Sequence, residues 1–232
     1  ARAVAGTPGD LLFCPGNHYS GAAALARLGG RWRRGPVVAK LSNMLDRPDQ
    51  GRLTRIGYRA WLRQHPRLFD RLVALTPALA EEAARLTGMA RDRIAVIANP
   101  PAQPIADAIP MAVPPGRFVL GVGRFAPQKR WDRLIAALPA LPGDVALLIL
   151  GEGAERAALE RQVAALGLGD RVMLPGHAAD PLPAMAAARV VALTSDFEGS
   201  PGVLAEAIAQ GTPVVATASS PAVAELIPGP GH

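Results

Sequence analysis

Two glutamates, Glu198 and Glu206, bracket a stretch whose residue types suit phosphate and sugar chemistry. The stretch, residues 198–210, reads E-G-S-P-G-V-L-A-E-A-I-A-Q and follows the apolar run of residues 190–193. This order predicts a strand, a tight loop and then a helix that begins near Gly202. In a parallel sheet such a helix start presents free N–H groups, and about half a positive charge, to the crevice beyond the strand ends. Phosphate is the group that this environment favours.

Glu206 is the unusual member of the stretch, because its carboxylate stands within the apolar string V-L-A-E-A-I-A. Burial of a charge is costly unless the charge has a partner or reaches solvent. Two interpretations follow. Glu206 is either a solvated helix glutamate or a carboxylate that accepts hydrogen bonds from a pair of sugar hydroxyls.

The stretch and its flanks read S-D-F-E-G-S-P-G-V-L-A-E-A-I-A-Q-G-T-P-V-V-A-T. Two glutamates at a fixed spacing are common, but the whole string resembles the donor-site signature of retaining GT-B glycosyltransferases of family 4, the glycosyltransferases group 1. The resemblance implies that Glu206 holds the ribose hydroxyls of a nucleotide-sugar donor. It also implies that Glu198 lies near the transferred sugar and the phosphates, with backbone donors supplied by residues 199–202.

Two cations, Arg124 and Lys129, flank a second strand-to-helix loop, which follows the apolar run F-V-L-G-V-G at residues 118–123. A diphosphate carries more charge than one helix start neutralises, and two cations on one loop can clamp it. Taken alone, these side chains would be read as surface charges, but R-F-A-P-Q-K also matches the family's pattern. We therefore predict Arg124, Lys129 and Glu198 as catalytic residues, the two cations stabilising the departing diphosphate.

Two further turns, L-I-L-G-E-G at residues 148–153 and L-P-G-H at residues 174–177, resemble family turns that line the nucleotide base. His177 then either stacks near the base or has no role, and the sequence favours neither. The predicted donor-binding residues are Gly123, His177, Gly199, Ser200, Gly202, Val203 and Glu206.

Polar residues also follow two predicted strands of the first half, residues 10–14 and 36–41, where a doubly wound sheet presents ligand contacts. His18 follows the first strand and is either a contact for acceptor or donor, as in the resembled family, or a solvated loop residue. Ser42 and Asn43 follow the second strand, where many family members carry a histidine near the reacting sugar. Ser42 cannot replace that histidine as a base near pH 7. His18, Ser42 and Asn43 are the acceptor-side candidates.

Arginines recur at every fourth position between Arg52 and Arg71, with apolar and aromatic residues among them. The repeating positions are Arg55, Arg59, Arg63, Arg67 and Arg71. This step predicts one basic side of a helix, which Pro66 is expected to interrupt or to replace with a second helix. A basic amphipathic surface predicts peripheral contact with an anionic membrane. The alternative is a solvated arginine face that packs on the domain by its apolar side.

Strand and helix patterns alternate along the chain, which predicts an α/β fold with parallel sheets and helices on both faces. The resemblance refines this to the GT-B type, with two Rossmann-like domains, the first incomplete. We expect a partial N-terminal acceptor-binding domain at residues 1–103, a proline- and alanine-rich linker at 104–116, and a C-terminal donor-binding domain at 117–232 that is truncated at its end.

The composition of the chain limits the cellular compartment and the partners that can be expected. Half of the 232 residues are apolar, and no run reaches the roughly 18 apolar residues of a membrane span. No signal-peptide pattern opens the chain and the single cysteine, Cys14, cannot form an internal disulfide, so we expect a cytoplasmic protein, with the inner face of the cell membrane as a second location.

The net charge of +6 suggests an acidic partner, but without a recognition motif we expect no nucleic acid. No cluster has metal-ligand spacing, so we expect no metal and no cofactor.

The predicted function is a retaining glycosyltransferase that moves a sugar from a donor, expected to be UDP-linked, to a glycan or lipid-linked acceptor in cell-envelope or polysaccharide synthesis. One alternative is a nucleotide-sugar-binding fragment without turnover. Another is a sugar-nucleotide epimerase of the same fold, although the acid and histidine set expected of it does not occur here. A basic nucleic-acid or membrane-binding module is the third.

Overall fold

The computed structural model describes residues 9–30, 32, 35–46, 49–100, 102–106 and 111–227. The chain divides into two compact units. The first comprises Ala1–Asn99 with the loops Glu198–Ser200 and Ser220–Ala222, and the second comprises Pro100–Phe197, Pro201–Ser219 and Val223–His232. Each unit contains one sheet in which all the paired strands are parallel, so the predicted α/β class is confirmed.

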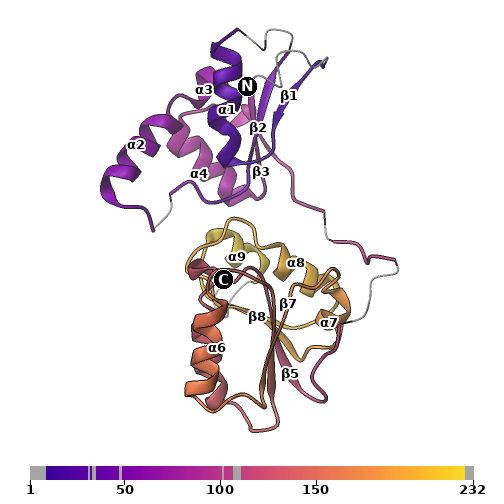
Figure 1. The fold of residues 1–232 in the computed structure, drawn as a ribbon. Helices are drawn as coiled ribbons and strands as arrows, with labels where there is room; N and C mark the ends of the chain where they lie inside the picture. Colours follow the sequence, from indigo (N-terminus) through magenta and orange to yellow (C-terminus); the bar gives the residue numbers. More distant parts are fainter. Residues whose placement is uncertain are drawn as a thin grey trace. The chain divides into compact units, whose positions relative to one another are not determined.

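The first unit contains a four-stranded sheet in the order β1-β2-β3-β4 (Figure 1). Its strands are β1 (Leu12–Cys14), β2 (Val37–Leu41), β3 (Arg71–Ala74) and β4 (Ile94–Val96). Its α-helices are α1 (Ser20–Leu28), α2 (Arg52–Leu62), α3 (His65–Leu68) and α4 (Pro77–Thr87), with short 3-10 turns at Asn17–Tyr19 and Arg91–Arg93. The sheet and these helices bury one apolar core, which includes Leu72 and Ala74 of β3 at 0% exposure.

Helix α4 shows how local signals fix an element. Thr76 caps its start, because the hydroxyl oxygen accepts a hydrogen bond from the backbone N–H of Leu79 at 3.1 Å. Pro77 occupies the first helical position, where its missing N–H costs nothing. Gly88 ends the helix in the left-handed conformation, with φ 74°. The helix therefore begins and ends where its sequence signals predict.

The second unit contains a five-stranded sheet in the order β7-β6-β5-β8-β9. Its strands are β5 (Phe118–Val122), β6 (Ala146–Leu150), β7 (Val172–Gly176), β8 (Val190–Leu193) and β9 (Val214–Ala216). The helices that follow them are α5 (Trp131–Ala137), α6 (Arg156–Ala165), α7 (Leu182–Ala187), α8 (Gly202–Ala209) and α9 (Pro221–Leu226), with 3-10 turns at Pro127–Lys129 and Leu138–Ala140.

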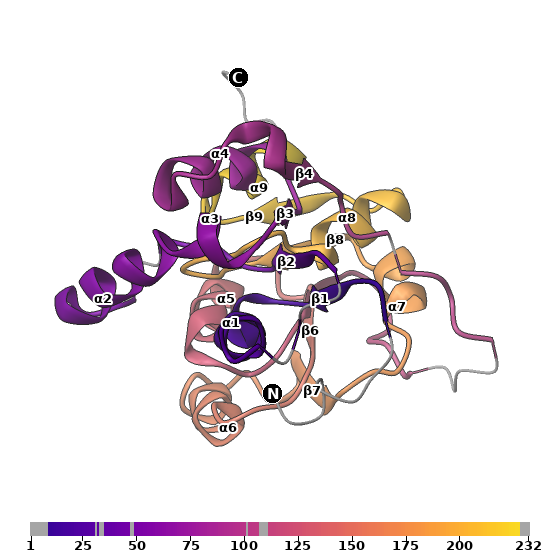
Figure 2. The same cartoon turned by 90° about the horizontal axis from the view of Figure 1, so that it is seen from above.

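Both faces of the second sheet are buried, as a parallel sheet requires. In β6, Leu147 and Ile149 belong to the core beneath α5 and α6, whereas Leu148 and Leu150 belong to the core beneath α7. Figure 2 shows α5 and α6 on one side of this sheet and α7 on the other. The near-continuous apolar run of β6 thus reflects two cores that share one strand.

The strand order of the second sheet reverses direction between β5 and β8. The chain first builds outward from β5 to β6 and β7, and then returns to the other side of β5 to add β8 and β9. Open α/β sheets bind ligands beyond the carboxyl ends of the strands at such a switch point. The switch point of this sheet therefore lies between the loops that follow β5 and β8.

The predicted arginine stripe is wrong as a single helix face, whereas the second helix expected at Pro66 is confirmed. Helix α2 ends at Leu62, and Pro66 lies in the separate helix α3, so only Arg55 and Arg59 of the repeating set belong to α2. These two pair with Asp46, at 3.0 and 2.8 Å. Arg71 begins β3 instead and donates to the backbone carbonyl of Asp92. The four-residue spacing of the arginines thus continues along the sequence, but the arginines belong to different elements of the structure.

The predicted linker, residues 104–116, includes residues 107–110, which lie outside the described residues. The linker and the domain boundaries around it therefore stay predictions. Among the described residues, no helix is long and apolar enough to cross a membrane.

Candidate functional site

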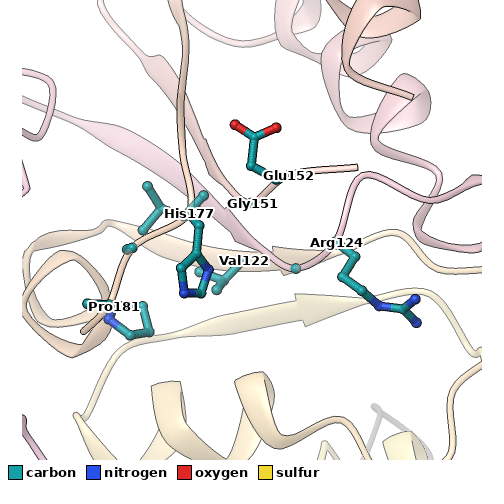
Figure 3. A pocket seen from close by; sticks show the side chains of 10 residues that line it. Val122, Arg124, Gly151, Glu152, His177 and Pro181 are labelled. Atoms are coloured by element: carbon teal, nitrogen blue, oxygen red, sulfur yellow. The ribbon is translucent and has the colours of Figure 1, made fainter. Parts of the chain in front are cut away.

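A pocket of about 400 Å³ opens at the carboxyl ends of β5, β6 and β7 in the second unit (Figure 3). It is lined by Val122, Gly123, Arg124, Leu150, Gly151, Glu152, His177, Ala178, Ala179 and Pro181. Three strand-end loops supply these residues. The pocket thus lies at the edge where a doubly wound sheet holds its ligand.

Backbone hydrogen bonds hold the three loops side by side. The N–H of Gly123 donates to Leu150 at 2.9 Å, and the N–H of Gly151 donates to Gly176 at 2.8 Å. The approach leaves no room for side chains, because a Cβ on Gly151 would stand 1.9 Å from the carbonyl oxygen of Gly123. At Gly153, where φ is 154°, a Cβ would stand 2.3 Å from the carbonyl oxygen of Phe125. The turn G-E-G is therefore required by the close approach of two loops.

Arg124 and His177 both line the pocket, from the loops after β5 and β7. Both side chains are exposed. The carboxylate of Glu152 points away from the His177 ring (Figure 3) and pairs instead with Arg156, with 2.8 Å between Nε and Oε2. The hydrogen bond from Arg156 lowers the pKa of Glu152 below its usual range. Arg124 is therefore the cation that the lining presents to a ligand.

Lys129 lies beside Gly123, which lines the pocket. A Cβ built on Gly123 would stand 3.3 Å from Cε of Lys129 and 3.3 Å from the ring of Trp131. Trp131 is 2% exposed and donates its indole N–H to the carbonyl oxygen of Arg124 at 3.1 Å. The loop from Gly123 to Trp131 is therefore wound around a buried indole, which brings both predicted cations to the same glycine.

Gly202, Val203 and Glu206 lie in α8, which begins at Gly202 after Pro201. A Cβ on Gly202 would stand 3.4 Å from Oε1 of Glu206, so the glycine leaves free space beside the carboxylate. Glu206 is half-buried, and burial raises its pKa above the usual value. The carboxylate is thus partly desolvated, which is the condition under which hydroxyl donors from a ligand matter most.

Glu198, Gly199 and Ser200 group with the first compact unit, although they follow β8 in sequence. Glu198 is buried, with 7% of its surface exposed. Because the loop belongs to the other unit, its approach to Arg124 and Lys129 stays a prediction.

The acceptor-side candidates lie at the carboxyl ends of β1 and β2 in the first unit. The side-chain amide of Asn17 joins the two loops, accepting from the N–H of Ser42 at 2.9 Å and donating to the carbonyl oxygen of Asn43 at 3.3 Å. A pocket of about 130 Å³ opens there, lined by Asn17, His18, Asn43, Met44, Gln50 and Tyr58. His18 and Asn43 therefore share a polar pocket, whereas Ser42 is not part of its lining.

Sequence reasoning missed several residues that line these pockets. In the second unit it missed the apolar wall, which includes Val122, Ala178 and Pro181, because small apolar residues after a strand carry no chemical signal. In the first unit it missed Asn17 and Tyr58. Asn17 did carry a usable signal, since it precedes His18 in the same strand-end loop.

Comparison with known proteins identifies the family to which the chain belongs. The sequence profile described as "Glycosyl transferases group 1" matches residues 110–228, just over half of the chain, and that described as "Glycosyl transferase 4-like domain" matches residues 1–100. The chain therefore belongs to the glycosyl transferases group 1 family. The predicted family is confirmed.

Two individual relatives show how much of the chain is similar to known glycosyltransferases. The chain is 42% identical over 101 residues to the lipopolysaccharide core biosynthesis glycosyltransferase LpsE of Rhizobium meliloti, covering 44% of this chain and 29% of that protein. It is 36% identical over 110 residues to a Campylobacter jejuni N-acetylgalactosamine-N,N'-diacetylbacillosaminyl-diphospho-undecaprenol 4-alpha-N-acetylgalactosaminyltransferase, covering 47% of this chain and 30% of that protein. The chain thus spans about a third of the length of these relatives.

Solved structures agree on the fold. The crystal structure of Anabaena Alr3699/HepE in complex with UDP-glucose matches with a TM-score of 0.73 and 26% identity, covering 94% of this chain and 62% of that one. The same protein in complex with UDP matches with a TM-score of 0.73 and 25% identity, over the same shares of the two chains. The predicted GT-B fold is therefore confirmed.

Proposed function

We propose that this protein is a glycosyltransferase that moves a sugar from a nucleotide-sugar donor to an acceptor hydroxyl. The observation that carries the proposal is the pocket beyond β5, where Arg124 lines the wall and Lys129 lies against Gly123. Two cations at a glycine that allows close approach suit a diphosphate, which is the leaving group of a nucleotide-sugar. The apolar wall at Val122 and Ala178 suits a nucleotide base.

In the proposed mechanism, negative charge develops on the diphosphate as the bond to the sugar breaks. Arg124 and Lys129 stabilise that charge, and the N–H groups at the start of α8 add to the field. Glu206 accepts hydrogen bonds from the ribose hydroxyls, and Glu198 lies near the transferred sugar. We propose retention at the anomeric carbon, with the acceptor attacking from the side of the leaving group and with no metal required.

UDP is the proposed nucleotide, and a glycan or lipid-linked molecule of the cell envelope is the proposed acceptor. The UDP and UDP-glucose complexes of the structural neighbour support the first point. The names of the relatives, one for the lipopolysaccharide core and one for a diphospho-undecaprenol-linked acceptor, support the second. His18 and Asn43 are then the proposed acceptor contacts in the first unit.

Thermal stabilisation by a panel of sugar nucleotides tests the donor site directly. A ligand that binds only the folded protein raises its melting temperature by mass action. We expect UDP and UDP-sugars to raise it and free sugars to leave it unchanged. A chain that no nucleotide stabilises would remove the donor site, and with it the proposed function.

Product analysis with a labelled donor separates the alternatives. Transfer to an acceptor supports the glycosyltransferase, and an inverted sugar on the intact nucleotide indicates an epimerase. Binding without product indicates a nucleotide-sugar-binding protein. The anomeric configuration of the product, read from its proton coupling constants, tests retention, since an inverted linkage contradicts it.

We also propose that α2 contacts an anionic membrane, which would place the protein at the inner face of the cell membrane. Two apolar residues one turn apart on α2, Leu53 and Ile56, are 84% and 58% exposed. Their exposure, next to the arginines of the same helix, supports interfacial binding. Replacement of both by serine should abolish sedimentation with anionic vesicles and leave UDP binding unchanged. Unchanged sedimentation would contradict the membrane contact.

A further inference from the structure

The loop that carries Lys129 is fastened to the segment that follows β8, across the switch point of the second sheet. Thr194 donates its hydroxyl hydrogen to the carbonyl oxygens of Lys129 and Arg130, at 3.0 and 2.9 Å. One hydroxyl has one hydrogen, so the bond is shared between two consecutive carbonyls. We call the hydrogen bonds between residues 128–130 and residues 194–197 the loop latch.

Gln128 and the backbone of the β8 segment complete the loop latch. The side-chain amide of Gln128 donates to the carbonyl oxygen of Phe197 at 2.6 Å. The N–H of Asp196 donates to the carbonyl oxygen of Gln128 at 2.9 Å. Phe197 directly precedes Glu198 in the chain. The loop latch therefore reaches from the predicted cation on one loop to the residue before the predicted carboxylate on another.

Arg130 holds the outer side of the same turn. It is the one non-glycine residue with positive φ in the described ranges, at φ 51° and ψ 43°, a conformation that side chains disfavour. Its guanidinium pairs with Asp132 at 2.9 Å and with Asp196 at 3.4 Å. A disfavoured conformation persists only where surrounding contacts enforce it. The turn after Lys129 is thus held by ion pairs outside and by Thr194 inside.

The loop latch matters for Lys129 because a lysine side chain is long and flexible. Four methylene groups separate its ammonium from the backbone, so its position depends on where the side chain begins and on what it packs against. The loop latch fixes where the side chain begins, and the side chain then lies along Gly123, where an added Cβ would stand 3.3 Å from Cε. A displacement of about 1 Å at a charged group in a site can cost roughly 100-fold in rate.

We propose that Thr194, assisted by Gln128, is a positioning residue that holds the Lys129 ammonium at the diphosphate of the donor. The proposal rests on the proposed function, and it assigns to both residues an action through Lys129 and no contact with the sugar nucleotide. Loss of the Thr194 hydroxyl therefore weakens diphosphate binding only as long as Lys129 is present.

The experiment measures UDP binding by calorimetry for Thr194→Val, Thr194→Ser and Gln128→Met. We expect the dissociation constant to rise about tenfold in Thr194→Val and about threefold in Gln128→Met, with Thr194→Ser within about twofold of the original protein. In a Lys129→Ala background, Thr194→Val should change the constant by less than about twofold. Gln128→Met serves as the readout if Thr194→Val does not fold.

Two control variants separate positioning from stability. Thr212 makes a bond of the same type in the second unit, from its hydroxyl to the carbonyl oxygen of Met185 at 2.8 Å, so Thr212→Val should lower the melting temperature and leave UDP binding intact. Ser195 is buried beside Thr194 and its hydroxyl has no hydrogen-bond partner within the described part of the chain, so Ser195→Ala should leave UDP binding unchanged.

Three results would overturn the inference. They are unchanged UDP binding in Thr194→Val, an equal loss in the Lys129→Ala background, and a loss in Thr212→Val as large as that in Thr194→Val. Absence of UDP binding in the unmodified protein is a different result, because it removes the proposed function and not only the loop latch.

Discussion

The two sheets hold their strand-end loops in different ways. In the second unit, backbone hydrogen bonds join the three loops that line the pocket, those after β5, β6 and β7, and glycines allow contacts that side chains would block. In the first unit, the amide of Asn17, a partly exposed side chain, joins the loops after β1 and β2. Backbone contacts are hard to change by substitution, whereas a side-chain bridge changes with one residue.

This difference suits two kinds of ligand. The diphosphate of a nucleotide-sugar presents the same charge whatever sugar is attached, so a loop set held by backbone contacts can serve every donor. An acceptor varies in shape, and a pocket braced by one amide adapts through single substitutions. The second unit is then the fixed half of the protein and the first unit the adjustable half, and substitutions in the two halves should differ in their effect on transfer.

Replacement of Lys129 by alanine should reduce the transfer rate by about 100- to 1,000-fold, because a fixed cation at the developing charge is removed. The melting temperature should be unchanged. The other lysine of the chain, Lys40, donates to Asn99 in the first unit, so Lys40→Ala is the matched control and should transfer normally. A transfer rate undiminished at saturating donor in Lys129→Ala would remove this residue from the mechanism.

Glu206→Gln should weaken donor binding about tenfold, since a charged acceptor of the ribose hydroxyls is exchanged for a neutral one. Because burial raises the pKa of Glu206, the carboxylate gains a proton at a higher pH than an exposed glutamate does. Donor binding should therefore fall as the pH is lowered through that raised pKa. Calorimetry as a function of pH should show this loss in the original protein and not in Glu206→Gln; equal pH profiles would assign the effect to another group.

His18→Ala should raise the KM for the acceptor by roughly three- to tenfold, the cost of one lost hydrogen bond, and leave UDP binding unchanged. Steady-state kinetics with each substrate varied in turn measures both. Only the KM for the acceptor should change, because His18 lies in the first unit. A change in UDP affinity of similar size would show that the two halves are not separable in this way.

His65→Phe should leave transfer unchanged and stabilise the first unit against acid. His65 is 2% exposed between the rings of Trp61 and Phe69, and its ring nitrogens have no hydrogen-bond partner in the described part of the chain. Burial lowers its pKa from 6.5 to about 4. As the pH falls, His65 therefore gains its proton in the unfolded chain before it does so in the folded protein. The free energy of unfolding is at its full value above pH 6.5 and decreases as the pH falls towards 4, by up to about 3 kcal/mol.

Urea unfolding of both proteins at pH 7 and pH 5 measures this difference. We expect the gap between His65→Phe and the original protein to widen at the lower pH. The same gap at both pH values would show that His65 does not titrate in this range.

The order of elements could be predicted from the sequence because apolar strand runs alternate with helix patterns, and at α4 Thr76 and Gly88 also mark both ends. The break in the arginine stripe could be predicted from Pro66, but the end of α2 at Leu62 could not, because the step of four residues continues through α2, the turn and α3. Arg124 could be placed beside the pocket from its position after a strand, whereas its role and that of Lys129 stay predictions. The wall at Val122 and Ala178 could not, because only the three-dimensional meeting of separate loops gives small apolar residues a role.

The most direct measurement is a calorimetric titration with UDP of a chain whose pocket is filled. Ala179 is exposed and lines the pocket, so Ala179→Trp should occupy the space without disturbing the buried loop contacts. Ala187 is exposed at the end of α7 and does not line the pocket, which makes Ala187→Trp the matched control. We predict that Ala179→Trp loses UDP binding and that Ala187→Trp retains it. Equal UDP binding by both variants would contradict the donor site described here.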